Sequence, residues 1–361
     1  MSRKALIAMS GGVDSSVAAL LMKEKGYDCI GVTMKLHDNR DNGLASEKSC
    51  CTSDDIADAG RVAERLGIPF YVVDYKADFK EKVMDPFVEA YLRGCTPNPC
   101  IECNRHLKFE HLYRKAEELG CDVIATGHYA CVDHDGTQYC LKRAADPAKD
   151  QSYVLYSLTQ EQLGHTMFPL GALKKEQVRE LARKHDLINA AKRESQDICF
   201  IPDGDYKRFM REHYHINIGD GEFVDRTGKV LGKHSGYYGF TIGQRRGLGI
   251  AAEAPYYVVD ILPERNQVVL GGNEDLYQTT LVAEHVNWLM SSDYKDMIIQ
   301  AKVRYRQAAQ NAYVKRLEGD RIQVEFLESQ RAITRGQAVV LYCGDIVIGG
   351  GTISALTTDR A

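Results

Sequence analysis

The sequence contains no run of about 18 consecutive apolar residues, the length that a membrane-spanning helix needs. The amino-terminal apolar stretch, Ala5–Met9, is too short for a secretory signal, and no cleavage pattern follows it. With 361 residues, 44% of them hydrophobic and 27% charged, the chain has the composition of a globular protein. We therefore expect a cytoplasmic protein of two or three domains with no membrane partner.

A large excess of charge of either sign is also absent. The formal net charge is -4, so any nucleic-acid contact would depend on local basic segments. Residues 301–321 carry six basic and two acidic side chains, and on alternating strands Arg304 and Arg306 would share a face opposite Tyr305. Such a surface can bind RNA, although a run of charged residues more often belongs to a solvent-exposed edge strand. Gln244–Arg246 is a second, weaker basic segment.

The cysteines do not form the pattern of a secreted disulfide framework or of a zinc domain. There are 11 of them, an odd number, which in a reducing compartment favours thiol chemistry or metal ligation. Cys100 and Cys103 form a CxxC pair, but no second CxxC or HxxxH pair supplies further zinc ligands. The cysteines within strand-like runs are best interpreted as small buried hydrophobes: Cys29, Cys121, Cys131, Cys140 and Cys343.

The first half of the chain alternates strand and helix patterns, which is typical of a parallel sheet covered by helices. Strands are expected at 4–9, 29–34, 70–73 and 122–125, and helices at 53–66, 78–92 and 105–119, with a polar loop around Asn42 and Gly43. Asp135-Gly136 predicts a hairpin over 129–143. Thr159 and Gln162 have capping-box spacing ahead of a mostly helical stretch that reaches about His185.

The residue composition and periodicity of the sequence change near Pro202. Glycine then becomes frequent up to about Asp275, and from Thr279 onwards alternating segments such as those at 298–305 and 337–343 suggest a small antiparallel barrel. The fold class is therefore α/β: a parallel-sheet nucleotide-binding domain, then a small β-rich domain, then a carboxyl-terminal β-barrel. We place the boundaries at 1–202, 203–278 and 279–361.

The segment Ser10–Ser16, SGGVDSS, lies between the first strand and the first helix. Two glycines let the backbone approach a phosphate, and the helix amino terminus favours its negative charge. The segment is neither a Walker A loop nor GxGxxG. It resembles the pyrophosphate loop (PP-loop) of the ATP-pyrophosphatase superfamily, whose members activate substrates by adenylation. That resemblance implies an adenine nucleotide alpha-hydrolase-like fold and ATP, with Mg²⁺, as a substrate.

A second cluster of chemical groups lies in the cysteines at 95–103 and at Cys199. Cys103 is expected at or near a helix amino terminus, where the helix dipole would stabilise its thiolate. With Cys199 it could form a sulfur relay, in which one thiol carries a persulfide and the other resolves it as a disulfide. An iron–sulfur cluster on Cys100, Cys103 and Cys199 is an alternative that we favour less, as are zinc and a purely structural role.

Four longer motifs favour the sulfur relay over the metal site and the structural role. They are TPNPCIECNRHLKF from Thr96, DPAKDQSYVLYSL from Asp146, ESQDICFIPDGDY from Glu194 and TIGQRRGLGI from Thr241. Together they resemble the tRNA-specific 2-thiouridylase family, and the resemblance covers essentially the whole chain. It implies a tRNA-uridine 2-sulfurtransferase that thiolates the wobble uridine. Its expected partners are tRNA and a cysteine desulfurase or sulfur-relay protein as the persulfide donor.

The resemblance also implies residue roles. Cys103 is expected as the nucleophile and Cys199 as the persulfide carrier. The ATP contacts are expected at Ala8, Met9, Ser10, Gly11, Gly12, Val13, Asp14, Ser15, Met34 and Gly127. The tRNA contacts are expected at Asn98, Pro99 and Cys100, which would face the target base, and at His128, Lys149, Asp150, Gln151, Arg304, Tyr305 and Gln337.

One departure from the family is Cys100, because well-known members have an aspartate there that is a candidate acid or base. Cys100 could instead be a metal ligand, a spare thiol or simply tolerated.

Two rival functions use part of the same pattern. One is an amidotransferase-type or ligase synthetase with the same ATP loop, which would have no need of paired cysteines. The other is an RNA-binding metal protein without activity, which would leave the SGGVDS loop unexplained.

Overall fold

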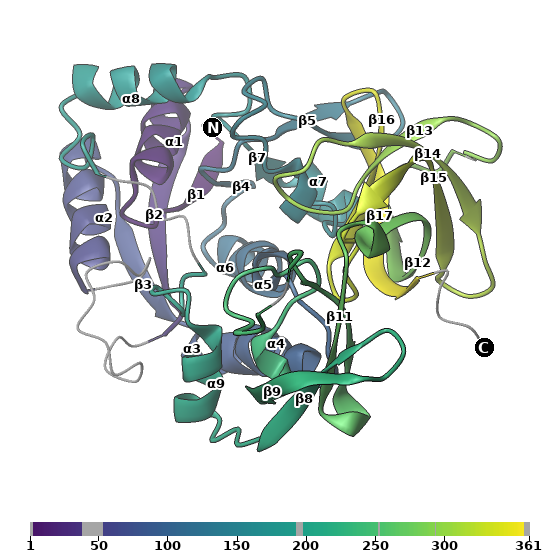
Figure 1. Cartoon of the computed structure of the whole chain (residues 1–361). Helices are drawn as coiled ribbons and strands as arrows, with labels where there is room; N and C mark the ends of the chain where they lie inside the picture. Colours follow the sequence, from purple (N-terminus) through teal and green to yellow (C-terminus); the bar gives the residue numbers. More distant parts are fainter. Residues whose placement is uncertain (1–2, 38–52, 193–197, 252, 293, 357–361) are drawn as a thin grey trace. The chain divides into compact units, whose positions relative to one another are not determined.

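The computed structural model describes residues 3–37, 53–192, 198–251, 253–292 and 294–356 (Figure 1). The predicted loop at Asn42 and Gly43 and the motif residues 194–197 lie outside this part of the chain. The chain divides into two compact units. The first comprises Met1–Met84, Pro99–Gly204 and Asp345–Ile348, and the second comprises Asp85–Asn98, Asp205–Gly344 and Gly349–Ala361.

The first unit is built on a five-stranded parallel sheet with the strand order β3-β2-β1-β4-β7. Successive side chains of the central strand β1 enter opposite faces, so Ala5 and Ile7 join one core cluster and Leu6 joins another. The strands are β1 (Lys4–Ala8), β2 (Asp28–Lys35), β3 (Phe70–Asp74), β4 (Val123–Ala125) and β7 (Thr166–Met167).

Helices cover both faces of this sheet (Figure 1). Helices α1 (Val13–Glu24), α2 (Ser53–Leu66) and α8 (Lys175–Lys184) contribute to the Ala5 and Ile7 cluster. Helix α6 (Leu112–Glu118) packs on the other face, around Leu6. The predicted α/β parallel-sheet domain is thereby confirmed. Among the described residues, no helix is long and apolar enough to cross a membrane.

Several local predictions for this unit are confirmed. Helix α2 has the predicted bounds, and the hairpin β5 (Cys131–His134) and β6 (Tyr139–Lys142) turns at Asp135-Gly136. At α7 (Gln160–Gly164), the Gln162 backbone amide donates to Thr159 Oγ1 over 3.1 Å, while Gln162 Oε1 accepts from the Thr159 amide over 3.0 Å. These features depend on residues close together in the chain.

Other predicted elements differ from the structure in their bounds, continuity or helix type. The stretch expected to be helical to His185 is interrupted by β7, a two-residue strand too short to give a periodic signal. The helix expected at 105–119 begins earlier and continues as α5 (Pro99–Glu102), the π-helical turns η2 (Cys103–His111) and α6. The helix expected at 78–92 is divided into α3 (Lys76–Phe79), the π-helical η1 (Lys80–Met84) and α4 (Asp85–Leu92).

The second unit contains a four-stranded sheet, a closed six-stranded antiparallel barrel and the helices α4 and α9 (Tyr206–His213). The four-stranded sheet has the order β10-β11-β8-β9, with β8 (Asp220–Asp225), β9 (Val230–Ser235), β10 (Tyr257–Leu262) and β11 (Gln267–Gly271). The barrel closes where β12 pairs with β17. It consists of β12 (Tyr277–Trp288), β13 (Ile299–Lys302), β14 (Gln310–Arg316), β15 (Ile322–Arg331), β16 (Ala338–Cys343) and β17 (Ile346–Leu356). The predicted β-rich domain and barrel are both present.

The predicted strand through Arg304–Arg306 is wrong. Strand β13 ends at Lys302, and the chain then turns, with the Gln307 amide donating to the Arg304 carbonyl over 3.2 Å. Tyr305 and Arg306 are both exposed, whereas Arg304 is half-buried. The basic residues and the tyrosine therefore do not alternate between two faces of a sheet.

Candidate functional site

The glycine-rich segment Ser10–Ser16 joins β1 to α1, as predicted. Its turn is held by its own hydroxyl groups, because Ser15 Oγ and Ser16 Oγ each donate to the Gly12 carbonyl over 3.0 Å. The helix begins after Gly12, which has no side chain with which to cap it. The first-turn amides of α1 are therefore open to an anionic ligand.

Gly11 shows why this turn requires glycine. Its φ angle is +71°, and an added Cβ atom would lie 2.2 Å from the backbone oxygen of Asp55. A side chain here would strain the backbone and collide with the start of α2. The loop therefore depends on direct backbone packing against that helix.

Asp14 is the charged residue of the loop, and the structure pairs it with residues that the sequence analysis missed. Lys175 Nζ, at the start of α8, lies 2.7 Å and 2.8 Å from the two carboxylate oxygens. The Tyr129 hydroxyl donates to Asp14 Oδ1 over 2.9 Å. The Lys175 side chain is 9% exposed and that of Asp14 is 28% exposed, so the lysine end of this ion pair is the more shielded from water.

Two further side chains hold the loop from beyond α8. Asn189 Nδ2 donates to the Gly11 carbonyl over 3.1 Å and to Ser16 Oγ over 2.7 Å. Lys192 Nζ donates to the same carbonyl over 3.2 Å and lies 2.6 Å from carboxylate oxygens of both Asp55 and Asp58. No local sequence signal identifies these partners, because they are more than 130 residues from their counterparts in the chain.

The predicted nucleotide residues beyond the loop lie near it. Gly127 follows β4, and a Cβ atom there would lie 2.8 Å from both the Asp14 carbonyl carbon and the Ser15 nitrogen. Met34 is two residues beyond Val32, which pairs with Ala8 at the end of β1. Met34 therefore lies at the carboxyl edge of the sheet, the edge where ligands bind in open α/β folds.

His128, adjacent to Gly127, is buried in the first unit. Its Nδ1 is 2.7 Å from Thr126 Oγ1, and its ring packs against Phe109 and Phe168, which also contact each other. Burial, assisted by the positive charge of Lys108, holds the pKa of His128 well below its usual range. The side chain is therefore a neutral imidazole at pH 7, suited to hydrogen bonding rather than to ion pairing with phosphate.

The predicted tRNA segment Lys149–Gln151 supports the loop that carries His128. Gln151 Oε1 accepts from the Tyr129 amide over 2.9 Å, and the Gln151 amide donates to the Tyr129 carbonyl over 2.8 Å. Asp150 accepts from the Ala144 and Ser152 amides, each over 3.1 Å. The acidic and amide side chains of this segment therefore make structural hydrogen bonds within the first unit.

Cys103 differs from the sequence-based expectation. The helical segment begins at Pro99, so Cys103 is its fifth residue rather than its first. Burial raises the pKa of the Cys103 thiol to about 11, with Cys100 adding to the rise and Lys108 opposing it. The predicted dipole-stabilised thiolate is therefore wrong for this conformation. Cys103 does begin the π-helical turns, a geometry that often occurs at functional sites.

Cys199 is half-buried in the same unit and is fixed by its neighbours. The ring of Phe200 packs edge-on against Phe79, with centroids 5.6 Å apart. The Ile201 amide donates to the Ile198 carbonyl over 2.9 Å, closing a turn around Cys199. This cysteine thus lies in a turn anchored to the core by the buried Phe200 and Ile201.

Cys100, Cys103 and Cys199 are the ligands of the iron–sulfur cluster that the sequence leaves as a less favoured alternative. Within the described ranges, no three His, Cys, Asp or Glu side chains are gathered so as to hold a metal ion. A ligating thiol must also be deprotonated, which the raised pKa of Cys103 opposes. The described residues do not fit a cluster in this conformation.

We predict that Cys103 in the free protein reacts with iodoacetamide at pH 7.5 about 100-fold more slowly than an unperturbed thiol, since only the thiolate reacts. The exposed Cys100 provides the internal comparison. Peptide mapping by mass spectrometry at several times would measure both rates. In 8 M urea the two cysteines should react alike, whereas equal rates in the native protein would contradict the buried, protonated Cys103.

The remaining predicted tRNA residues lie in the second unit. Gln337 Nε2 donates to the Thr96 carbonyl over 2.7 Å, and the Thr96 amide donates to the Arg335 carbonyl over 2.8 Å. Gln337 therefore holds the chain two residues before Asn98, where the segment predicted to face the target base begins. Tyr305 is exposed and has Lys302 Nζ 5.7 Å from its ring centroid.

A phosphate-binding loop at the carboxyl edge of a parallel α/β sheet defines a nucleotide-binding domain of the HUP class. Residues 3–203 match the family described as "tRNA methyl transferase HUP domain". Residues 207–272 match a tRNA methyl transferase PRC-barrel domain, and residues 278–353 match an aminomethyltransferase beta-barrel domain.

Curated relatives identify the family. The chain is 49% identical to the tRNA-specific 2-thiouridylase MnmA of Clostridioides difficile, over 98% of each chain. It is 52% identical to that of Carboxydothermus hydrogenoformans, over 97% of each chain. A solved 4-thiouridine synthetase–RNA complex with bound ATP aligns at a TM-score of 0.37 and 16% identity, over 58% of this chain and 50% of that one. The chain belongs to the tRNA-specific 2-thiouridylase family, as its motifs predicted.

Proposed function

We propose that the protein is a tRNA-uridine 2-sulfurtransferase that uses ATP to thiolate the wobble uridine of tRNA at C2. Family membership supports tRNA thiolation. The observation that carries the proposal is that one unit contains both the Ser10–Ser16 loop and the cysteines Cys103 and Cys199. An activating nucleotide and a pair of thiols are the two requirements for replacing a carbonyl oxygen by sulfur.

The first step activates the base. ATP enters with Mg²⁺ as substrate, and the amides of Gly11–Asp14 and the amino terminus of α1 bind its phosphates. The uridine O2 attacks the α-phosphorus, and pyrophosphate leaves. The carbonyl oxygen O2, a poor leaving group, is thereby bonded to the α-phosphorus. It can then leave as part of AMP, which is a good leaving group. Gly127 packs directly on the backbone of this loop at Asp14 and Ser15, which supports its proposed place beside the nucleotide.

The second step transfers sulfur. A cysteine desulfurase or relay protein supplies a persulfide to Cys199. Cys103 then attacks the inner sulfur, so hydrosulfide leaves and a Cys103–Cys199 disulfide forms. Hydrosulfide attacks C2, AMP departs, and a reductant restores the two thiols. Direct attack by the outer persulfide sulfur on C2 is the alternative route.

The tRNA contacts are proposed on both units. In this proposal Asn98–Cys100 faces the target base, and His128 and Lys149–Gln151 contact the RNA nearby. In the second unit, Arg304–Tyr305 and Gln337 complete the set. Tyr305 is exposed and can stack on a base, whereas Arg304 and Gln337 are half-buried and act partly by holding neighbouring backbone in place.

The decisive experiment incubates the purified protein with ATP, Mg²⁺, sulfide and an unmodified tRNA transcript carrying a wobble uridine. A thiolated transcript migrates more slowly on a mercury-containing gel. We expect retardation that requires both ATP and protein, and none for a matched transcript with cytidine at the wobble position. Unretarded tRNA under all conditions, or retardation without ATP, would contradict the proposed function.

A further inference from the structure

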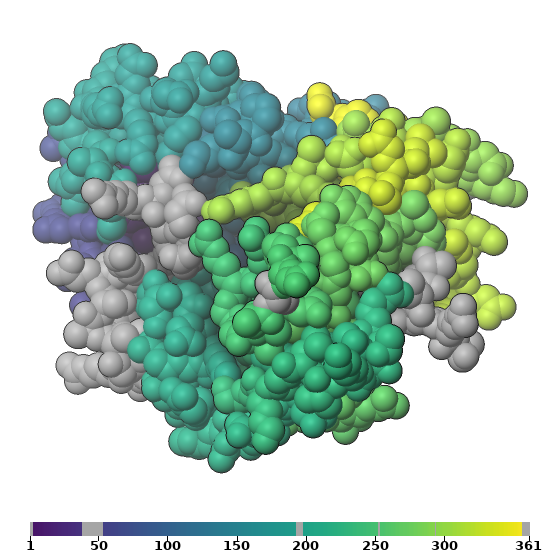
Figure 2. Space-filling model, in the orientation of Figure 1, coloured from purple at the N-terminus to yellow at the C-terminus, as the bar shows by residue number. Residues whose placement is uncertain are grey.

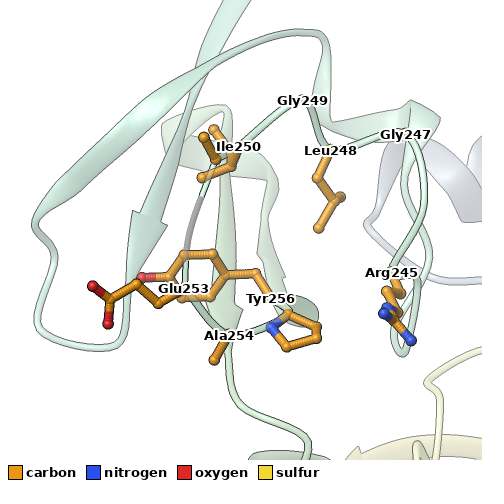
Figure 3. Close-up of a pocket in the computed structure, with 10 residues that line it drawn as sticks. Arg245, Gly247, Leu248, Gly249, Ile250, Glu253, Ala254 and Tyr256 are labelled. Atoms are coloured by element: carbon orange, nitrogen blue, oxygen red, sulfur yellow. The ribbon is translucent and has the colours of Figure 1, made fainter.

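A loop of the second unit, described at residues 243–251 and 253–256, lines an open hollow of about 430 Å³ (Figure 3). It precedes β10 and includes the basic pair Arg245-Arg246. Figure 3 shows Leu248 and Ile250 above the ring of Tyr256, with Arg245 on one side and Glu253 on the other. The volume falls within the range of roughly 300–1,000 Å³ that small-ligand sites occupy. In the space-filling view, the middle part of the chain lies at the surface of the face shown (Figure 2).

Two backbone hydrogen bonds hold the base of this loop in place. The Gly243 amide donates to the Val258 carbonyl over 2.8 Å, and the Val258 amide donates to the Gln244 carbonyl over 2.9 Å. Gln244 also bridges the loop with its side chain, accepting from the Thr241 amide over 3.1 Å and donating to the Arg246 carbonyl over 3.0 Å. The hollow is therefore largely preformed, which lowers the cost of ordering it around a ligand.

The chemistry of the hollow matches a nucleotide. Arg245 lines the hollow together with Glu253, and Arg246 is the next residue of the loop. Both arginines are exposed, and neither is ion-paired with a carboxylate of the described part of the chain. In a protein with a net charge of -4, two adjacent unneutralised guanidinium groups favour an anion, and guanidinium binds phosphate in a bidentate manner. Tyr256 is half-buried and presents an aromatic ring beside apolar side chains, which suits a stacked base.

Arg304 joins this loop to the turn that carries Tyr305. Its Nη2 donates to the Ile242 carbonyl over 3.2 Å, to the Ala332 carbonyl over 2.9 Å and to Thr334 Oγ1 over 2.7 Å. Gly243 packs so closely here that an added Cβ would lie 2.9 Å from Ala332 Cβ. The exposed turn at Tyr305 and the base of the loop are therefore neighbouring parts of one surface.

We propose that this loop, through its described residues 243–251 and 253–256, binds a nucleotide of the tRNA other than the target uridine. Its base stacks on Tyr256, its phosphate is held by Arg245 and Arg246, and Arg304 is a positioning residue that fixes the base of the loop. This inference rests on the proposed function, because it takes tRNA as the substrate. It extends the predicted contacts at Tyr305 by an element on the adjoining surface.

The test uses the full chain carrying Arg245→Gln and Arg246→Gln, with equilibrium binding of an unmodified tRNA transcript measured between 50 and 200 mM NaCl. We expect affinity at 50 mM to fall on the order of 10-fold and the salt slope to flatten by about 1.4 to 1.8, the effect of losing two phosphate contacts. Arg265→Gln is the matched control. Arg265 is an exposed arginine in the turn that follows the far end of β10, and both quantities should stay unchanged there.

Tyr256 is tested separately. Tyr256→Ala should weaken binding on the order of 10-fold with an unchanged salt slope, because stacking releases no counterions. Tyr256→Phe keeps the ring and should bind as the wild type does. Loss of binding in Tyr256→Phe as well, or none in Tyr256→Ala, would overturn the stacking assignment.

The two levels of inference fail differently. If the wild-type protein makes no 2-thiouridine in the mercury-gel assay, the proposed function is wrong. If the wild type thiolates tRNA while the double arginine variant keeps the wild-type affinity and salt slope, the loop is not an RNA contact. We expect that variant to show a raised KM for tRNA and a wild-type maximal rate at saturating tRNA.

Discussion

Replacing Cys199 or Cys103 by serine is expected to reduce 2-thiouridine formation from a persulfide donor by roughly 1,000-fold or more, the scale of losing a nucleophile that forms a covalent intermediate. Cys199 would no longer carry the persulfide, and Cys103 would no longer open it. Cys100→Ser is the matched control, since two sulfurs suffice for the exchange, and it should retain much of the activity. Mercury-gel retardation of tRNA measures all three rates.

The persulfide itself distinguishes the relay from a metal cluster. In Cys103→Ser, a Cys199 persulfide should accumulate after incubation with a donor, visible by mass spectrometry as one additional sulfur on the Cys199 peptide. If Cys100→Ser failed as completely as the other two, and anaerobically purified protein held stoichiometric iron and sulfide, the relay would be wrong.

The second large effect is expected at Asp14. Asp14→Ala should abolish ATP-dependent thiolation and also destabilise the protein by about 3 kcal/mol, because it leaves the buried ammonium group of Lys175 without its carboxylate. Urea unfolding measures the stability, and release of pyrophosphate in the presence of tRNA measures the activation step.

A double variant separates the two roles. In Asp14→Ala with Lys175→Met, no uncompensated buried charge remains, so most of the lost stability should return. Activity should stay absent, because the loop still lacks its acidic side chain. Near-normal thiolation by this double variant would show that Asp14 serves only to hold α8, and would remove it from the ATP site.

Features that depend on neighbouring residues were predictable from the sequence. The bounds of α2, the capping box at Thr159 and Gln162 and the hairpin turn at Asp135-Gly136 all arise from propensities and hydrogen bonds within a few residues. The position of the phosphate loop between β1 and α1 follows from the same local pattern. The four long motifs likewise identified the family. A motif is defined by the order of its residues, so it can be recognised without knowledge of the three-dimensional geometry.

Features that depend on distant segments were decided by the tertiary structure. Lys175 meets Asp14 across 161 positions, and Asn189 meets Gly11 across 178. Burial, which no motif encodes, raises the pKa of Cys103 that the helix dipole was expected to lower. In the same way, Arg304 belongs to a turn rather than a strand, because three acceptors from two other segments hold its guanidinium. The order of the amino acids specifies which chemical groups are present and how far apart they are in the chain. Packing decided which of them meet and in which protonation state, because contacts and solvent exposure are properties of the assembled fold.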